Sequence, residues 1–214
     1  MTNGEQTNRK KRLPAPERRK VILDAAQRTF VEFGYHGALM ETIAERAEVT
    51  KPILYRHFSS KLDLLLAILE RAGGELRDAL LQPDPDEMDW ITSVKHSIHS
   101  YFNSVIRSDK AFRLVYATDL NVDRRASELI TQIRAAIIEI VANMIRSYTD
   151  TSIVSSSDID VLAVILVGMV ETTVIYWMNH EDLPHEMYED NLIRAAASIL
   201  AHLPPRQQPS ATNV

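Results

Sequence analysis

Apolar residues recur at helical spacing along nearly the whole of this chain of 214 residues. Near the N-terminus, Ile22, Ala25 and Ala26 begin the i, i+3, i+4 rhythm of an amphipathic helix. Gly34 can close that helix, because glycine accepts the left-handed backbone that often follows the last helical turn. No segment shows sustained two-residue alternation between turn signals, the pattern of a half-buried strand. The sequence therefore predicts an all-α fold of about nine helices.

The ends of the expected helices are set by polar residues, glycines and prolines between the apolar segments. After the helix that closes at Gly34, we expect helices over residues 40–47, 51–57, 60–81, 86–107, 109–118, 122–148, 158–179 and 185–203. Ser60 is suited to cap the helix at 60–81. Residues 1–16 and 204–214 are polar and contain several prolines, so we expect a disordered basic arm and a disordered tail.

Charge is divided unevenly along the chain, although the formal net charge is −5. Residues 1–61 hold 12 Lys or Arg and 7 Asp or Glu, a net charge of +5. Residues 62–214 hold 12 Lys or Arg and 22 Asp or Glu, a net charge of −10. A small basic part attached to a larger acidic part is expected where only one end of a protein meets phosphate.

Several function classes are disfavoured by composition. The chain has no cysteine, which excludes disulfides and cysteine-ligated zinc and suits a cytoplasmic protein. The N-terminal segment has no apolar core like that of a signal peptide, and the longest apolar run, residues 161–170, is shorter than a membrane span of about 20 residues. His180 and His185 miss the zinc-protease spacing by one residue, with Pro184 between them. We therefore expect no membrane span, no metal, no cofactor and no enzymatic activity.

Residues 41–58 have the pattern of two short helices joined by a tight turn. Ile43, Ala44 and Ala47 would turn the first helix toward the core, and Val49 would fill the turn. Thr50 is placed to cap the second helix, which carries mostly polar and basic side chains on its outer face. This pattern predicts a helix-turn-helix whose second helix can enter the major groove of DNA.

The same region resembles the TetR (tetracycline-repressor) family. The segments ILDAAQRTFVEFGYHG, METIAERAEVT and KPILYRHFSSKLDLL follow one another at the family's usual spacing within residues 17–70. The resemblance implies that Tyr55, His57 and Lys61 contact phosphates and that Lys51 and Pro52 contact bases. It implies the following DNA-contacting set: Thr50, Lys51, Pro52, Tyr55, Arg56, His57 and Lys61.

Three departures from the family pattern affect this region. Ala38 and Leu39 precede the second helix, where the family often has Ser or Thr, so a side-chain N-cap is expected to be missing. Glu41 occupies a position where some members have a base-reading cation, and it would repel phosphate or select a cytosine amine. Glu48 replaces the usual glycine of the turn, and a left-handed backbone there would cost about 1 kcal/mol.

The resemblance also implies an organisation for the whole chain. We expect a three-helix DNA-binding domain over residues 17–61 and a helical effector-binding and dimerisation domain over 62–203. The helices at 158–179 and 185–203 would form the homodimer interface, because both have wide apolar faces. The basic arm would either contact the minor groove or serve as a solubilising terminus.

The apolar segment VLAVILVGMVETTVIYWM contains one acidic residue, Glu171. A buried carboxylate needs a partner, so Glu171 would satisfy a buried hydroxyl or arginine, lie at the dimer interface, or line an effector cavity. For the cavity we expect the following residues, whose aromatic and methionine members are, taken one by one, more often ordinary core: Phe102, Phe112, Tyr116, Met144, Met169, Glu171, Thr172 and Tyr176.

The helix-turn-helix pattern and the resemblance together imply a ligand-responsive regulator, expected to be a repressor, that binds a palindromic operator as a dimer. A looser similarity to TetR-type regulators of lipid genes implies an apolar or lipidic effector such as a long-chain acyl-CoA. The alternatives are a helical interaction module that does not bind DNA and, less favoured, an enzyme. The enzyme alternative lacks a glycine-rich phosphate loop, a nucleophile elbow and a metal triad.

Overall fold

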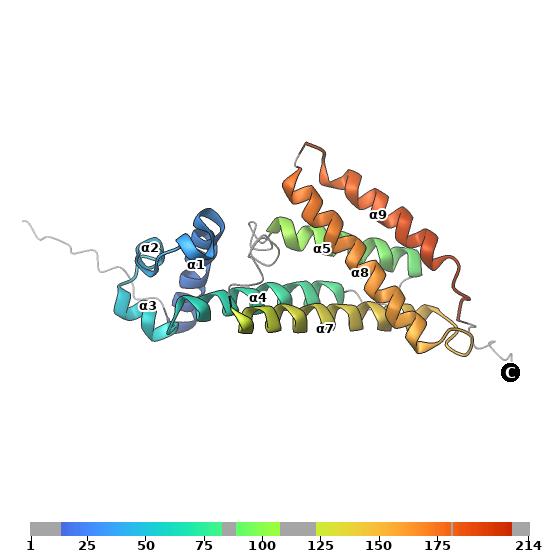
Figure 1. Cartoon of the computed structure of the whole chain (residues 1–214), viewed down its shortest axis with the longest axis horizontal. Helices are drawn as coiled ribbons and strands as arrows, with labels where there is room; N and C mark the ends of the chain where they lie inside the picture. The colour runs from blue at the N-terminus through green and yellow to red at the C-terminus, as the bar shows by residue number, and fades with distance from the viewer. Residues whose placement is uncertain (1–13, 83–88, 108–122, 181, 207–214) are drawn as a thin grey trace, which may run out of the picture.

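Figure 1 shows a computed structural model of the chain, which describes residues 14–82, 89–107, 123–180 and 182–206. Within these ranges the chain forms eight helices: α1 (Ala15–Gly37), α2 (Met40–Arg46), α3 (Lys51–His57), α4 (Lys61–Leu80), α5 (Trp90–Arg107), α7 (Arg124–Tyr148), α8 (Ser156–Asn179) and α9 (His185–Leu200). The prediction of an all-α fold is confirmed. The helix expected at 109–118, and with it Phe112 and Tyr116, lies outside the described residues.

The helices form two groups along one long axis (Figure 1). α1, α2 and α3 gather at one end, and α5, α8 and α9 cover the other. α4 and α7 lie side by side between them, with Gly73 at their contact, where a Cβ atom would come within 2.9 Å of the Ile133 side chain. The glycine therefore lets the two helices approach closely.

Two clusters of buried apolar residues correspond to these groups. The first unites α1, α2, α3 and the start of α4, with Ala126 and Ile130 of α7 packed against them. The second is built from the end of α4 and from α5, α7, α8 and α9. Because α4 belongs to both clusters, it connects them physically. The division of the chain at residues 61 and 62 stays a prediction.

Side-chain caps or prolines mark where several helices begin. Ser60 accepts a hydrogen bond from the backbone N–H of Asp63 (3.1 Å), as expected for an N-cap. α1 already begins at Ala15, because Pro16 fits the first helical turn, so residues 14–16 are not part of a disordered arm. Gly34 has a φ of 68° and interrupts the regular helix before its last residues.

α8 differs from the sequence-based expectation about membranes. By length and composition α8 (Ser156–Asn179) could cross a membrane: its most apolar 18-residue window has a mean hydropathy of 2.0, and 28% of that window is buried. The length of the uninterrupted apolar run at 161–170 therefore underestimates the apolar length of this helix, because α8 continues beyond Glu171. One such helix is weak support for a membrane span. Its large exposed apolar side chains are Val161, Val164, Ile165 and Tyr176.

Candidate functional site

α2 and α3 form a helix-turn-helix on the first core cluster. Ile43 and Ala44 of α2 and Leu54 of α3 are buried, which fixes both helices against α1 and α4. The turn between them is closed by backbone hydrogen bonds from Glu48 to Glu45 (3.0 Å) and from Val49 to Ala44 (3.0 Å). Glu48 has a φ of 51°, so the left-handed backbone expected there is confirmed.

The outer face of α3 carries most of the residues expected to contact DNA. Lys51, Pro52, Tyr55 and Arg56 are exposed and share one side of the helix, while Leu54 points into the core. Two short helices with this exposed polar and basic face can place α3 in a DNA groove.

α2 and α3 lack the side-chain N-cap hydrogen bond that Ser60 provides for α4. Leu39 precedes α2 without a side-chain cap, as expected. Thr50 stands at the N-cap position of α3, but its hydroxyl makes no capping hydrogen bond, so that prediction is wrong. The Thr50 carbonyl instead accepts hydrogen bonds from the N–H groups of Ile53 and Leu54 (2.9 and 3.0 Å). The first turn of α3 is therefore held by backbone hydrogen bonds. The Thr50 hydroxyl is therefore not used in holding the helix.

Glu41 and Lys51 form an ion pair between α2 and α3. Both side chains are about half exposed (50% and 53%). The hydrogen bond from Lys51 lowers the pKa of Glu41, so the carboxylate stays charged at neutral pH. The two expectations for Glu41, repulsion of phosphate and selection of a cytosine amine, did not include this contact. In the structure the Glu41 carboxylate binds the Lys51 ammonium group at the start of α3.

His57 and Lys61 have less freedom than the other expected DNA contacts. In the described part of the chain, His57 Nε2 is buried and has no hydrogen-bond partner. Desolvation, followed by the charges of Arg56, Arg18 and Arg19, lowers the pKa of His57, which is therefore neutral at pH 7. Lys61 Nζ donates to the carbonyls of His36 (3.2 Å) and Ala38 (3.1 Å), which ties α4 to the end of α1 and the residue that follows it.

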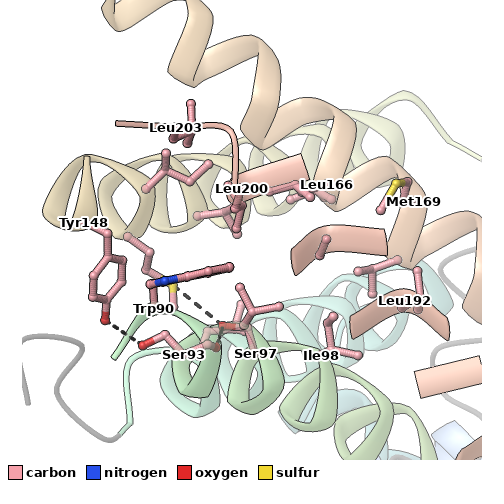
Figure 2. A pocket seen from close by; sticks show the side chains of 18 of the residues that line it. Trp90, Ser93, Ser97, Ile98, Tyr148, Leu166, Met169, Leu192, Leu200 and Leu203 are labelled. Atoms are coloured by element: carbon pink, nitrogen blue, oxygen red, sulfur yellow. Dashed lines mark hydrogen bonds between the residues drawn. The ribbon is translucent and has the colours of Figure 1, made fainter. Parts of the chain in front are cut away.

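A second candidate site is a cavity of about 280 Å³ in the helical body. It lies between α5, α7, α8 and α9, with Leu80 of α4 at its wall (Figure 2). The described residues that line it include no charged side chain. A mainly apolar cavity of this kind, just below the usual range of about 300–1,000 Å³, suits a small apolar ligand.

The cavity contains only part of the expected lining. Met144 and Met169 line it, whereas Phe102, Glu171, Thr172 and Tyr176 do not. Phe102 is fully buried in the core beside Trp177, and Tyr176 is 54% exposed. Glu171 forms an ion pair with Arg134 of α7 (3.0 Å), which agrees with the arginine alternative for its partner.

Sequence reasoning missed the polar residues of the cavity. Ser93 Oγ lies 2.7 Å from the Tyr148 hydroxyl, and Ser97 Oγ donates to the Ser93 carbonyl (2.9 Å). Trp90 lies beside this group (Figure 2). Serine and tyrosine on amphipathic helices carry no sequence signal that separates a cavity from a surface.

The segment after α9 closes one side of the cavity. The Asp150 N–H donates to the Pro204 carbonyl (3.0 Å), and the Arg206 N–H donates to the Tyr148 carbonyl (2.9 Å). Leu203 and Pro205 line the cavity. Residues 204–206, expected to be disordered, are thus held as a strand-like strap, because Pro205 bridges to Thr149. We refer to residues 202–206 as the C-terminal strap.

These features define a helix-turn-helix regulator of transcription. Residues 22–68 match the family model described as "Bacterial regulatory proteins, tetR family". Residues 92–199 match a second model, "Tetracyclin repressor-like, C-terminal domain", which alone spans half of the chain. The chain belongs to the TetR family.

Individual relatives agree with this assignment. The transcriptional activator FasR of Mycolicibacterium smegmatis is 30% identical over 194 residues, which cover 90% of this chain and 87% of FasR. A TetR-like regulator from Rhodococcus sp. RHA1 superposes with a TM-score of 0.71 at 25% identity, covering 89% of this chain and all of that one. The fatty acid degradation regulator FadR from Bacillus halodurans has the same fold (TM-score 0.72, 19% identity, covering 90% and 97%).

Proposed function

We propose that this protein is a cytoplasmic, ligand-responsive regulator that binds a palindromic operator as a homodimer. Its DNA affinity would be set by an apolar or lipidic effector such as a long-chain acyl-CoA. The observation that carries the proposal is the combination, in one TetR-family chain, of an exposed α3 face and an uncharged cavity.

The proposed DNA contacts are those of α3 and the residues beside it. Lys51 would donate to guanine, Tyr55 and Arg56 would contact phosphates, and Thr50 and Pro52 would meet the groove. His57 and Lys61 would reach phosphates only by changing the contacts described above. The exposure of Lys51, Pro52, Tyr55 and Arg56 supports this division.

The proposed dimer interface is formed by α8 and α9. Val161, Val164 and Ile165 of α8 are 46–58% exposed, although the helix is apolar. A group of exposed apolar side chains of this kind often marks a contact surface between subunits. Two recognition helices would then lie about one helical turn of DNA apart, roughly 34–36 Å.

The dimer is tested by sedimentation at several concentrations. Ile165→Glu is expected to shift the protein toward monomer. Ile153→Glu is the matched control, because Ile153 is more exposed (69%) but precedes α8. An unchanged mass for Ile165→Glu would place the interface elsewhere.

DNA and effector binding are tested together by mobility shift with the DNA upstream of the protein's own gene. Tyr55→Phe combined with Lys51→Ala is expected to abolish the shift, and long-chain acyl-CoA, but not CoA alone, is expected to change the wild-type shift. Failure of the wild type to bind any selected palindrome would favour a helical interaction module. Resemblance to the family predicts repression, whereas FasR is named an activator, so in vitro transcription with the same fragment determines the sign.

A further inference from the structure

Arg19, near the start of α1, lies against the end of α3. Its guanidinium group stands over the Phe58 ring, 4.8 Å from the ring centroid. Phe58 directly follows α3 and is only 4% exposed, so this contact holds the arginine where α1 meets α3. Arg19 itself remains exposed to solvent. An exposed cation is therefore held beside the proposed recognition helix.

Arg56 supplies a second exposed cation at the same junction. It lies in the last turn of α3, next to His57. Desolvation is the main cause that lowers the pKa of His57. The charges of Arg56, Arg18 and Arg19 lower this pKa further, in that order. The charges that act on the imidazole are thus all cations, and both helices contribute them. Arg19 and Arg56 therefore share one region of positive potential.

These two arginines differ from other cations of the helix-turn-helix. Arg46 pairs with Glu32 (2.7 Å), and the lysine at the start of α3 is paired as well. Arg19 and Arg56 form no ion pair with any residue that the structure describes. Like charges repel each other, and an anion bound between them removes that repulsion. A phosphate group fits this role, because guanidinium groups donate paired hydrogen bonds to its oxygens.

The position of the two arginines favours a phosphate of the DNA backbone. When the N-terminal residues of a recognition helix contact bases, the structure around that helix faces the sugar-phosphate strands. Arg56 follows the exposed Tyr55 on α3, and Arg19 reaches the same end of α3 from α1. Both guanidinium groups therefore lie at the edge of the face that would meet DNA.

We propose that Arg19 and Arg56 bind one and the same backbone phosphate in each half of the operator. The phosphate would bridge α1 and α3 and hold the recognition helix at one angle to the groove. This inference rests on the proposed DNA binding. It adds a contact from α1, whose residues are absent from the set expected to meet DNA.

Arg19→Gln tests this contact in the full-length protein, by fluorescence anisotropy with a palindrome that the wild type selects. The affinity is expected to fall about tenfold, as for one charge-assisted hydrogen bond, and its salt dependence is expected to become shallower. Arg28→Gln is the matched control, because Arg28 is exposed on the same helix but nine residues further along, and so on the opposite face. Equal effects of the two variants would overturn the inference.

Methylphosphonate identifies the phosphate, because it removes the charge of one backbone position. Its placement at one position in each half-site is expected to weaken wild-type binding. On that duplex, Arg19→Gln and Arg56→Gln should each cause little further loss. On unmodified DNA, the loss for the double variant should be smaller than the sum of the two single losses, since both side chains act on one group.

Two results with the modified duplexes would contradict a shared phosphate. Cancellation of the two effects by different phosphates would show that Arg19 and Arg56 make separate contacts. A loss for Arg19→Gln that persists on every modified duplex would show that Arg19 acts through its packing on Phe58. In both cases the wild type still binds DNA, and the proposed function stands. Failure of the wild type to bind any palindrome would remove the proposed function and this inference together.

Discussion

Glu41, in the first turn of α2, forms an ion pair with Lys51, the first residue of α3. The carboxylate thereby neutralises and orients the cation at the N-terminal end of the proposed recognition helix. Because neither residue is paired elsewhere in the described contacts, the pair controls how freely Lys51 can reach a phosphate or a base.

Glu41→Gln is expected to release Lys51 toward DNA. Binding to unrelated DNA should tighten more than binding to the operator, so the ratio between the two should fall. One additional phosphate contact would steepen the dependence of log K on log salt by about 0.9. Fluorescence anisotropy over a salt series measures both quantities. Glu45→Gln, an equal charge change on the same exposed helix, should leave them unchanged, and an equal effect of both variants would contradict a specific role for the pair.

Glu48→Gly is expected to stabilise the folded protein. A non-glycine residue at a φ of 51° costs about 1–2 kcal/mol, part of which is offset by the greater freedom of glycine in the unfolded chain. We expect the free energy of unfolding to rise by about 0.5–1 kcal/mol in urea denaturation. The neighbouring Ala47→Gly should instead destabilise, since Ala47 has a φ of −82° and is buried. A loss of stability for Glu48→Gly would show that the glutamate side chain stabilises the turn.

Stability is expected to depend on pH through His57. Its pKa is lowered in the folded protein, so the unfolded chain binds the proton more readily. The stability contribution is complete above the unfolded pKa of about 6.5 and is lost as pH falls below it. Urea denaturation at pH about 8 and about 5.5 should therefore show a smaller difference for His57→Gln than for the wild type. His202→Gln, at an exposed position after α9, should retain the wild-type difference.

Removal of the C-terminal strap is expected to open the cavity. A chain that ends at Ala201 lacks Leu203 and Pro205 from the wall and the backbone hydrogen bonds to Tyr148 and Asp150. Ligand dissociation should be faster and the melting temperature lower. A chain that ends at Arg206 keeps these contacts and is the control. Equal dissociation rates, measured by stopped-flow Trp90 fluorescence, would show that ligands enter elsewhere.

The DNA-binding end could be predicted closely from sequence because its signals are local. The short helices, the Ser60 cap and the left-handed backbone at Glu48 depend on residues within a few positions of one another. The missing hydroxyl cap of Thr50 shows the limit of this reasoning, because cap identity does not fix the side-chain rotamer.

The contacts that sequence reasoning missed join residues far apart in the chain. Lys61 reaches carbonyls 23 and 25 residues earlier, and Ser93 meets Tyr148 across 55 residues. Arg134 lies 37 residues before Glu171. The sequence pattern marks Glu171, as an acidic residue in an apolar segment, but gives no sign of Arg134 as its partner. Helical periodicity predicts which face of a helix is inside, but it does not predict which helices share a cavity. Phe102 is therefore ordinary core, the alternative left open for it, and Tyr176 is exposed, which neither alternative included.

The C-terminal strap also affects how the protein can be labelled and purified. Arg206 is held beside Tyr148, which lines the cavity, at the end of the molecule away from α1, α2 and α3 (Figure 1). An affinity tag or fluorescent protein attached directly after Arg206 would begin beside the cavity, where it would compete with ligands or loosen the strap. Tag position is therefore an experimental variable for this protein, and ligand screens should use material from which the tag has been cleaved.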